Sequence, residues 1–295
     1  MNGIEGRPLP DIRTMHIMSF GTTAPSATAL WLSDLHLDQA DRAGISSLLD
    51  KISGINYSSL IVTGDISQAS QLSRHLRMLA AACAPRPMHF VLGNHDYFGS
   101  GFDEVDHAVA DLCDSTKNLF HLGGREIISL DNDVALIGVR GWADARAGYG
   151  KRTVIDSPDR LRIDDFMHLG AEAMLDRMRA LGSESAALIR QTLPWALSRH
   201  RHVVIATHVP PFPELVRFNG HGCGKARLPH FTNLSIGLAI RGITRSFPTR
   251  RVTVLCGHTH SPARMMVLPN LEVRVAGAQT ARPGLQNLIH FTSRE

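Results

Sequence analysis

Cysteine is scarce in this chain of 295 residues: there are four, and no two of them form a Cys-x-x-Cys pair. Their spacing indicates neither a disulfide framework nor a cysteine-ligated zinc site. Aromatic residues are also few, at 6% of the chain, whereas surfaces that bind single-stranded nucleic acid usually stack bases on aromatic rings. Lysine and arginine are spread along the chain, so the net charge of +4 favours an ordinary solvated surface over a basic binding face.

Long hydrophobic runs are lacking as well. No stretch approaches the roughly 18 apolar residues of a membrane-spanning helix, and the first 28 residues lack the basic start and apolar core of a secretory signal. We therefore expect a cytoplasmic protein without membrane association. A content of 43% hydrophobic and 20% charged residues is typical of a soluble globular protein whose core needs no metal or disulfide to form.

From Ala29 onward, short apolar runs alternate with helical patterns. Asp41 and Ser67 are expected to cap two of the helices. This alternation predicts an α/β layered fold with helices packed on a mixed sheet. The expected helices are 41–53, 68–83, 103–117, 183–199 and 233–246, and the expected hairpins are 126–140 and 264–275.

We interpret residues 1–295 as a single domain. Residues 1–27 carry no periodic pattern and are expected to form a loose N-terminal arm or a peripheral strand. Residues 141–182 interrupt the alternation and indicate an insertion over one rim of the site. Residues 212–231 are a second long connection, and such connections are often lids or binding loops.

Five polar motifs each follow an apolar, strand-like run. Side chains at the carboxyl ends of strands in an α/β sheet converge on one crevice. The motifs therefore predict one site built from distant parts of the chain. They are Asp34-x-His36, Gly64-Asp65, Gly93-Asn94-His95-Asp96, Thr207-His208 and Gly257-His258-x-His260.

Seven side chains in these motifs can ligate a metal through oxygen or nitrogen. Four ligands fill a structural zinc site, so seven are more than one ion needs, and we expect two divalent ions with a bridging carboxylate. Asp65 stands alone at the end of its strand and is the natural bridge. Manganese, iron, zinc and nickel all suit these ligands. The seven are Asp34, His36, Asp65, Asn94, His208, His258 and His260.

Two divalent ions outweigh the charge of two aspartates and a bridging hydroxide, so the centre would attract an anionic phosphate. The ions would also lower the pKa of the shared water and supply a hydroxide nucleophile near neutral pH. The departing oxygen then needs a proton donor. We expect His95 to be this general acid, with Asp96 holding its ring in one tautomer.

The ordered motifs resemble those of the calcineurin-like metallophosphoesterases: Asp-x-His, Gly-Asp, Gly-Asn-His-Asp/Glu, His and Gly-His-x-His. The resemblance spans residues 30–262 and includes all five motifs. It implies a layered α-β-β-α sandwich of two mixed sheets flanked by helices. It also implies two ligand sets that share Asp65: Asp34, His36, Asp65 and His260 for one ion, and Asp65, Asn94, His208 and His258 for the other.

Two departures argue against the serine/threonine protein phosphatase branch of this family. The Gly64-Asp65 motif continues with Ile66 and Ser67 rather than with Asp-Arg-Gly, and Asp96 stands where those phosphatases carry Glu.

Further side chains near the motifs are candidates for binding substrate. For Trp142 the commoner alternative is packing in the core, whereas His221 and Lys225 could contact the phosphate or the leaving group from the second long connection. The candidates are Asn94, Arg140, Trp142, Asp144, His221 and Lys225.

The sequence thus predicts a metal-dependent phosphohydrolase that cleaves a phosphomonoester or phosphodiester of a small molecule or nucleotide. A nuclease or pyrophosphohydrolase of the same family is the alternative enzyme, although no obligatory nucleic-acid partner is indicated. A non-catalytic scaffold for protein binding is the third hypothesis. It is disfavoured because every expected ligand and His95 are present.

Overall fold

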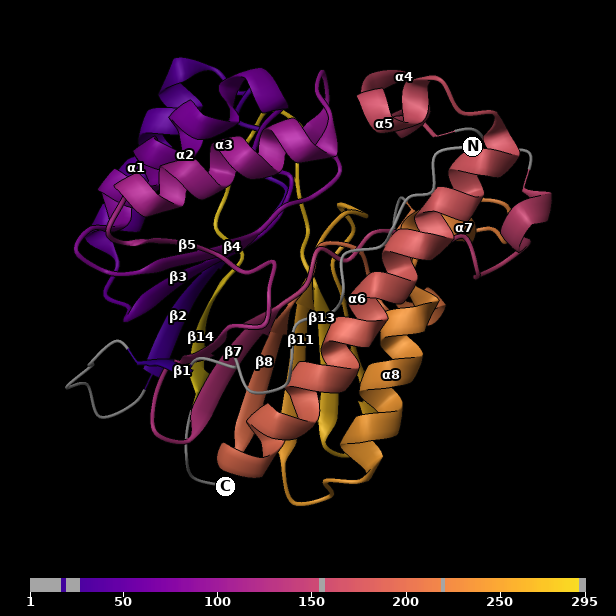
Figure 1. The fold of residues 1–295 in the computed structure, drawn as a ribbon. Coiled ribbons are helices and arrows are strands. Elements are labelled where there is room, and N and C mark those ends of the chain that lie inside the picture. Colours follow the sequence, from indigo (N-terminus) through magenta and orange to yellow (C-terminus); the bar gives the residue numbers. More distant parts are fainter. Residues whose placement is uncertain (1–16, 20–26, 154–156, 219–220, 292–295) are drawn as a thin grey trace.

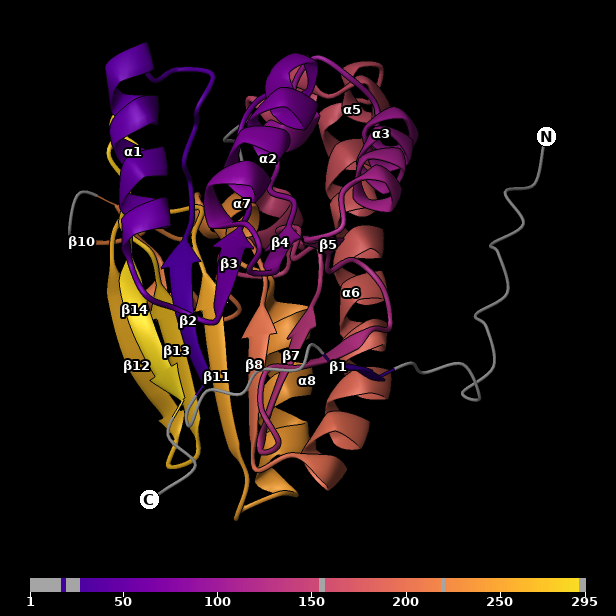
Figure 2. The same cartoon turned by 90° about the vertical axis from the view of Figure 1, so that its left-hand side faces the viewer.

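The computed structural model describes residues 17–19, 27–153, 157–218 and 221–291. Two β-sheets lie face to face, and helices cover the outer face of each (Figure 1; Figure 2). This arrangement confirms the predicted α-β-β-α sandwich of mixed sheets. Most of the expected N-terminal arm falls outside the described residues.

One sheet has five strands. Four neighbouring strands run parallel, and the last strand of the chain pairs antiparallel with them at one edge. The strand order is β14 (Asn287–Phe291), β2 (Ala27–Leu32), β3 (Ser59–Thr63), β4 (Met88–Val91) and β5 (Leu119–His121).

The other sheet has seven strands and includes both predicted hairpins, β6–β7 and β12–β13. A peripheral strand from the expected arm, β1, pairs parallel with β6 at one edge. The order is β1 (Ile17–Ser19), β6 (Ile127–Ser129), β7 (Val134–Gly138), β8 (His202–Ala206), β11 (Arg251–Cys256), β13 (Leu271–Val275) and β12 (Ala263–Leu268). A separate ribbon joins β9 (Arg217–Phe218) and β10 (His221–Gly222).

Three helices cover the five-stranded sheet, and two cover the seven-stranded sheet (Figure 2). The first three are α1 (Arg42–Gly54), α2 (Ala69–Cys83) and α3 (Phe102–Ser115), and the other two are α6 (Ala171–Arg199) and α8 (Leu234–Arg245). The short helices are α4 (Asp159–Arg162), α5 (Asp164–Met167) and α7 (Leu228–Phe231), with 3-10 turns η2 (His95–Tyr97), η3 (Gly150–Arg152) and η4 (Pro213–Leu215).

The sheets pack together through apolar side chains that strand alternation directs inward. Trp31 and Ile61 come from the five-stranded sheet, and Val204 and Leu255 come from the seven-stranded sheet. The indole of Trp31 donates to Oγ1 of Thr63 at 3.0 Å, which satisfies its one polar atom inside this core. A rigid two-sheet core therefore lies beneath the strand ends that carry the motifs.

Two details differ from the sequence predictions. Asp41 caps α1 as expected, because its Oδ1 accepts from Gly44 N at 2.7 Å, but the second helix has Gln68 at its N-cap position instead of Ser67. Helix α6 begins at Ala171 rather than at residue 183, so part of the expected rim insertion is a long helix.

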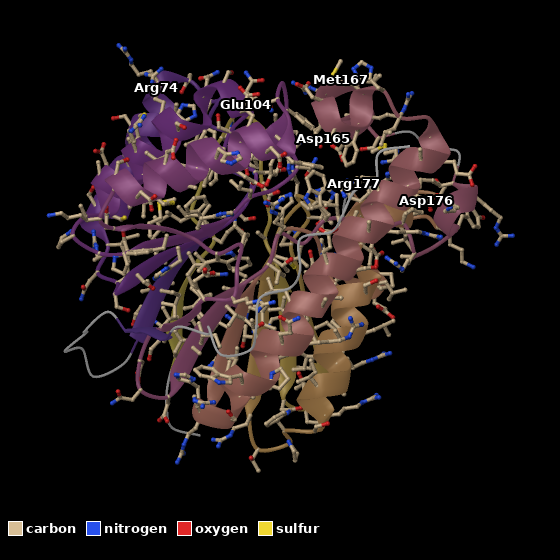
Figure 3. The ribbon with its side chains drawn as sticks, viewed as in Figure 1. Arg74, Glu104, Asp165, Met167, Asp176 and Arg177 are labelled. Carbon is tan, nitrogen blue, oxygen red and sulfur yellow. The ribbon has the colours of Figure 1, made fainter. Side chains whose placement is uncertain are left out.

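The rim segment packs against α3 and the loop that precedes it. Oδ2 of Asp165, which Figure 3 labels, accepts from the backbone N–H of Phe102 at 2.7 Å. Backbone bonds join Gly99 N to Arg162 O and Asp164 N to Ser100 O. The segment is therefore fastened to the chain that directly follows the Asn94 motif.

No helix among the described residues is long and apolar enough to cross a membrane.

Candidate metal centre

The five motif loops meet at one end of the sandwich. The loops follow β2, β3 and β4 of one sheet and β8 and β11 of the other. Backbone hydrogen bonds from Asp34 N to Gly64 O and from Gly257 N to His208 O join neighbouring loops. The backbone N–H of His258 also donates to Oδ1 of Asp34 at 2.8 Å, which joins a loop of one sheet to a loop of the other.

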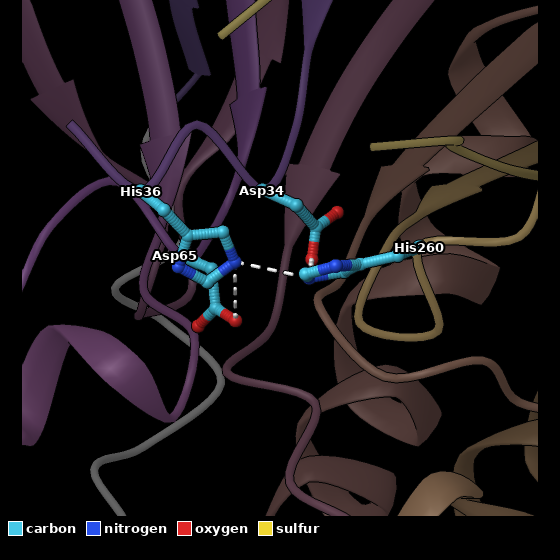
Figure 4. A group of neighbouring side chains, drawn as sticks. All are labelled: Asp34, His36, Asp65 and His260. Atoms are coloured by element: carbon cyan, nitrogen blue, oxygen red, sulfur yellow. Dashed lines mark hydrogen bonds and ion pairs between the residues drawn. The ribbon is translucent and has the colours of Figure 1, made fainter. Parts of the chain in front are cut away.

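One group of candidate ligands consists of Asp34, His36, Asp65 and His260 (Figure 4). Nε2 of His36 lies 3.7 Å from Oδ2 of Asp65, and Nε2 of His260 lies 3.6 Å from Oδ1 of Asp34. The two Nε2 atoms are 3.0 Å apart. Four side chains from three loops thus direct their ligand atoms toward one small volume.

A second group shares Asp65 with the first and adds His208 and His258. Nε2 of His208 lies 3.3 Å from Oδ1 of Asp65 and 3.2 Å from Nδ1 of His258. The amide oxygen of Asn94 is 3.2 Å from Nε2 of His208. The structure therefore brings together all seven predicted ligands in two groups joined by Asp65; that they bind ions stays a prediction.

Hydrogen bonds to backbone carbonyls orient two of the imidazoles. Nδ1 of His208 donates to Thr63 O at 2.8 Å, and Nε2 of His258 donates to His230 O at 3.0 Å. Such bonds fix which ring nitrogen carries the proton and leave the other one free to ligate a metal. His208 therefore presents Nε2 to the site, whereas His258 presents Nδ1.

Five of the seven residues adopt a left-handed backbone conformation that non-glycine residues rarely occupy. Such conformations cost free energy and tend to occur at functional sites, where the surrounding structure holds them in place. The positive φ angles are 52° at Asp34, 42° at His36, 52° at Asp65, 69° at His258 and 55° at His260.

Two glycines allow the loops to approach one another. A Cβ atom on Gly93 would collide with Oδ1 of Asp65, and one on Gly257 would collide with Oδ2 of Asp34. The carboxylate of Asp65 thus lies directly against the backbone of Gly93, and that of Asp34 lies against Gly257. Neither position has room for a larger residue.

The chemistry of these groups fits divalent cations. Asp34 and Asp65 are buried, at 3% and 1% exposure. Their ion-pair partners among the described residues are histidines rather than lysine or arginine. Buried carboxylates require a positive partner, and hard oxygen and imidazole ligands suit first-row divalent metals.

Electrostatic interactions define the protonation of the metal-free site. Burial opposes charge on Asp65 and His208, but their mutual attraction is stronger. It holds the pKa of Asp65 well below its usual range and raises the pKa of His208 to about 10. Burial, followed by the charge of His208, lowers the pKa of His258 to about 3. His258 is thus ready to ligate at neutral pH, whereas a metal must displace a proton from His208.

A hollow of about 580 Å³ opens over the ligand groups. His95 lies in its wall with 29% of its side chain exposed, and its Nε2 is 4.0 Å from Oδ2 of Asp65. The ring of His95 packs between His36 and Phe98, with centroid distances of 4.6 Å and 4.2 Å. His95 is therefore held beside the ligand groups and is accessible from the hollow, as a proton donor must be.

Asp96 has a different position from the one predicted. Its Oδ1 accepts from the backbone N–H groups of Ile66 and Ser67 at 2.8 Å and 2.9 Å, and its Oδ2 accepts from Gly93 at 2.8 Å. Both oxygens thus bind backbone, because the η2 turn directs adjacent side chains to different sides. Asp96 joins two ligand loops instead of orienting the ring of His95.

Three of the substrate-binding candidates have structural partners. Arg140 forms an ion pair with Asp106. Trp142 is buried in a cluster with Tyr97, Phe102 and Phe166.

The third of these candidates, Asp144, is fully buried, and its Oδ2 accepts from the backbone N–H of Ser235 at 2.7 Å. The remaining two candidates outside the ligand set, His221 and Lys225, are exposed and do not line the hollow within the described chain. None of the five lines this hollow, although Arg140 and Trp142 line a small cavity beside it together with Asn94. That any of them contacts substrate stays a prediction.

The hollow is also lined by residues that the sequence did not mark as candidates, among them Asp159, Arg227, His230 and Phe231. All four lie in the two long connections that were expected to be lids. The connections themselves were therefore a usable signal, but they have no periodic pattern that would mark individual residues.

The model of the calcineurin-like phosphoesterase family matches residues 27–262, and the chain belongs to this family. Among solved structures, a dimetal phosphatase from Danio rerio is similar, with a TM-score of 0.56 at 13% identity over 86% of this chain and 88% of that one. The protein TT1561 of Thermus thermophilus is similar with a TM-score of 0.50 at 12% identity, over 91% of this chain and 100% of that one. No curated protein matches the sequence.

Membership of this family implies a hydrolase of phosphoric esters that uses divalent metals. At such low identities, the solved structures support the fold alone. What this chain hydrolyses must therefore be argued from its own site.

Proposed function

We propose that the protein is a metal-dependent phosphohydrolase that cleaves a phosphomonoester or phosphodiester bond in a small molecule or nucleotide. One observation carries the proposal: two ligand groups share Asp65, and members of both groups line a hollow whose wall includes His95.

The roles of the residues follow from their positions. Asp34, His36, Asp65 and His260 would hold one ion, and Asp65, Asn94, His208 and His258 would hold the other. When bound, the ions supply Lewis acidity toward the phosphate and lower the pKa of a bound water. His95 would donate a proton to the departing ester oxygen, because its ring lies beside the ligands and faces the hollow.

The shape of the hollow favours a small substrate over a polymer. Ser157, Pro158 and Asp159 from the rim segment form part of its wall, and Arg227 and His230 from the second connection form another part. A volume of about 580 Å³ is within the usual range of small-molecule sites. We therefore favour a phosphohydrolase with a small substrate over a nuclease. The complete ligand set favours the same function over a non-catalytic scaffold.

The test is hydrolysis of p-nitrophenyl phosphate and bis(p-nitrophenyl) phosphate by metal-stripped protein. Manganese, iron, zinc and nickel are added back one at a time, and ions bound per chain are measured in parallel. We expect turnover that depends on the added metal and is lost in Asp65→Ala. Two bound ions without turnover of either ester would contradict the proposal.

A further inference from the structure

A second hollow, of about 440 Å³, adjoins the first at the candidate metal centre. Its wall includes Asp34 from the ligand set and, farther out, Arg282 and Gly284. His260 and Ala278 line both hollows. The ligand group that contains Asp34 and His260 therefore borders two open spaces instead of one.

The two hollows differ in chemistry. The first contains His95, the candidate proton donor, together with Asn94 and His258, whereas the second contains none of these residues among its described lining. The group that leaves with a proton must lie next to the donor. A departing group therefore belongs in the first hollow.

A phosphomonoester has one organic group, which the first hollow accommodates alone. A phosphodiester has a second group on the same phosphorus, and that group needs space on another side of the centre. The second hollow supplies this space, because His260 lines both hollows. Its outer wall carries the exposed Arg282, while the wall of the first hollow carries Arg227.

We propose that the second hollow binds the retained ester group of a phosphodiester, so that the protein is a phosphodiesterase. This inference rests on the proposed hydrolase function and selects between its two substrate classes. In the reaction, the oxygen of one water bonds to phosphorus and the phosphorus–oxygen bond to the group in the first hollow breaks. The departing oxygen takes a proton from His95, and His95 regains one from the consumed water.

Gly284 offers a way to fill the second hollow without touching a ligand. A Cβ atom built on Gly284 meets nothing within 4 Å, and its backbone is not left-handed. Gly284→Trp should therefore fold and place an indole where the retained group would lie. Gly242 on α8 also has nothing within 4 Å of its Cβ, and it is exposed far from the site. Gly242→Trp is the matched control.

The experiment compares kcat/KM for bis(p-nitrophenyl) phosphate and p-nitrophenyl phosphate. We expect the ratio of diester to monoester activity to fall about tenfold or more in Gly284→Trp, the effect of losing one specific pocket, and to stay unchanged in Gly242→Trp. Equal losses for both esters, or an unchanged ratio, would overturn the proposal.

A binding measurement separates this inference from the proposed function. Diphenyl phosphate, whose phenoxide groups leave slowly, is titrated by calorimetry into metal-loaded His95→Ala protein with and without Gly284→Trp. Weaker binding in the double variant is the expected result, and equal binding would refute the second hollow as a subsite. Absence of turnover for both p-nitrophenyl esters would instead refute the hydrolase itself.

Discussion

Asn94 donates a hydrogen bond from Nδ2 to Oδ1 of Asp159 at 2.9 Å, which joins the third motif to the rim segment. A carboxylate can only accept, so the bond fixes which end of the Asn94 amide is nitrogen. The amide oxygen then faces Nε2 of His208 at 3.2 Å. Asp159 is 8% exposed, so water competes little for the bond. Asp159 thus orients a candidate ligand without being one.

Asp159→Ala should weaken binding of the ion held by Asn94, His208 and His258, because the amide would be free to rotate. Loss of a partner that orients a ligand typically costs about 10–100-fold in metal affinity. Calorimetric titration of metal-stripped protein would measure both binding steps. We expect the other step, which does not involve Asn94, to keep its affinity.

Asp159→Asn is the matched control for that change. Its side-chain oxygen can still accept from Asn94, so its metal affinity should remain close to that of the wild type. If Asp159→Ala bound both ions as tightly as the wild type, the rim segment would have no part in positioning Asn94.

The second prediction concerns His95 as the proton donor. His95→Ala should lower kcat by about 10²–10⁴-fold for an ester with a poor leaving group, the usual contribution of general acid catalysis. The loss should be smaller for p-nitrophenyl phosphate than for phenyl phosphate, because nitrophenoxide departs with little need of a proton. Equal losses for the two esters would assign His95 a role other than proton donation.

The two ligand groups predict how ions are lost on substitution. His260→Ala should leave one ion per chain, and so should His258→Ala, because each residue belongs to one group. Asp65→Ala should lose both ions, because both groups share its carboxylate. Metal content after desalting would measure this, with circular dichroism to confirm folding. Two ions retained by Asp65→Ala would contradict the shared site.

The sequence predicted the ligand set because each ligand follows a strand. An apolar run that ends in Gly, Asn or Asp, such as Ile61 to Asp65, indicates both a buried strand and the loop at its end. Since strand ends converge, order along the chain was sufficient to predict which residues meet.

Side-chain direction within a turn was beyond the sequence. Asp96 follows His95 directly, but the η2 turn that contains both residues directs the carboxylate of Asp96 to Gly93 and Ile66 instead of to the imidazole. The start of α6 was missed because Gly182 resembles a helix boundary. In the fold, a Cβ at Gly182 would collide with Cβ of Asp144, so this glycine allows the helix to lie close to that residue.

The pKa values of two histidines remote from the metal centre predict how the free energy of unfolding depends on pH. His89 in β4 is completely buried, and burial lowers its pKa to about 3. Burial, followed by the nearby charge of Arg140, lowers the pKa of His121 in β5 to about 4. In the unfolded chain, both titrate near the usual value of about 6.5.

Well above pH 6.5, both histidines are neutral in both states and do not affect the free energy of unfolding. As the pH falls from about 6.5 toward 4, the unfolded chain binds protons that the folded chain excludes. Each histidine should then lower the free energy of unfolding by up to about 1.4 kcal/mol per pH unit. Urea unfolding of metal-stripped protein between pH 4.5 and 7.5 would measure this slope. His121→Phe, which keeps a ring against Phe90, should have the shallower slope; an identical slope would show that His121 is protonated in the folded protein.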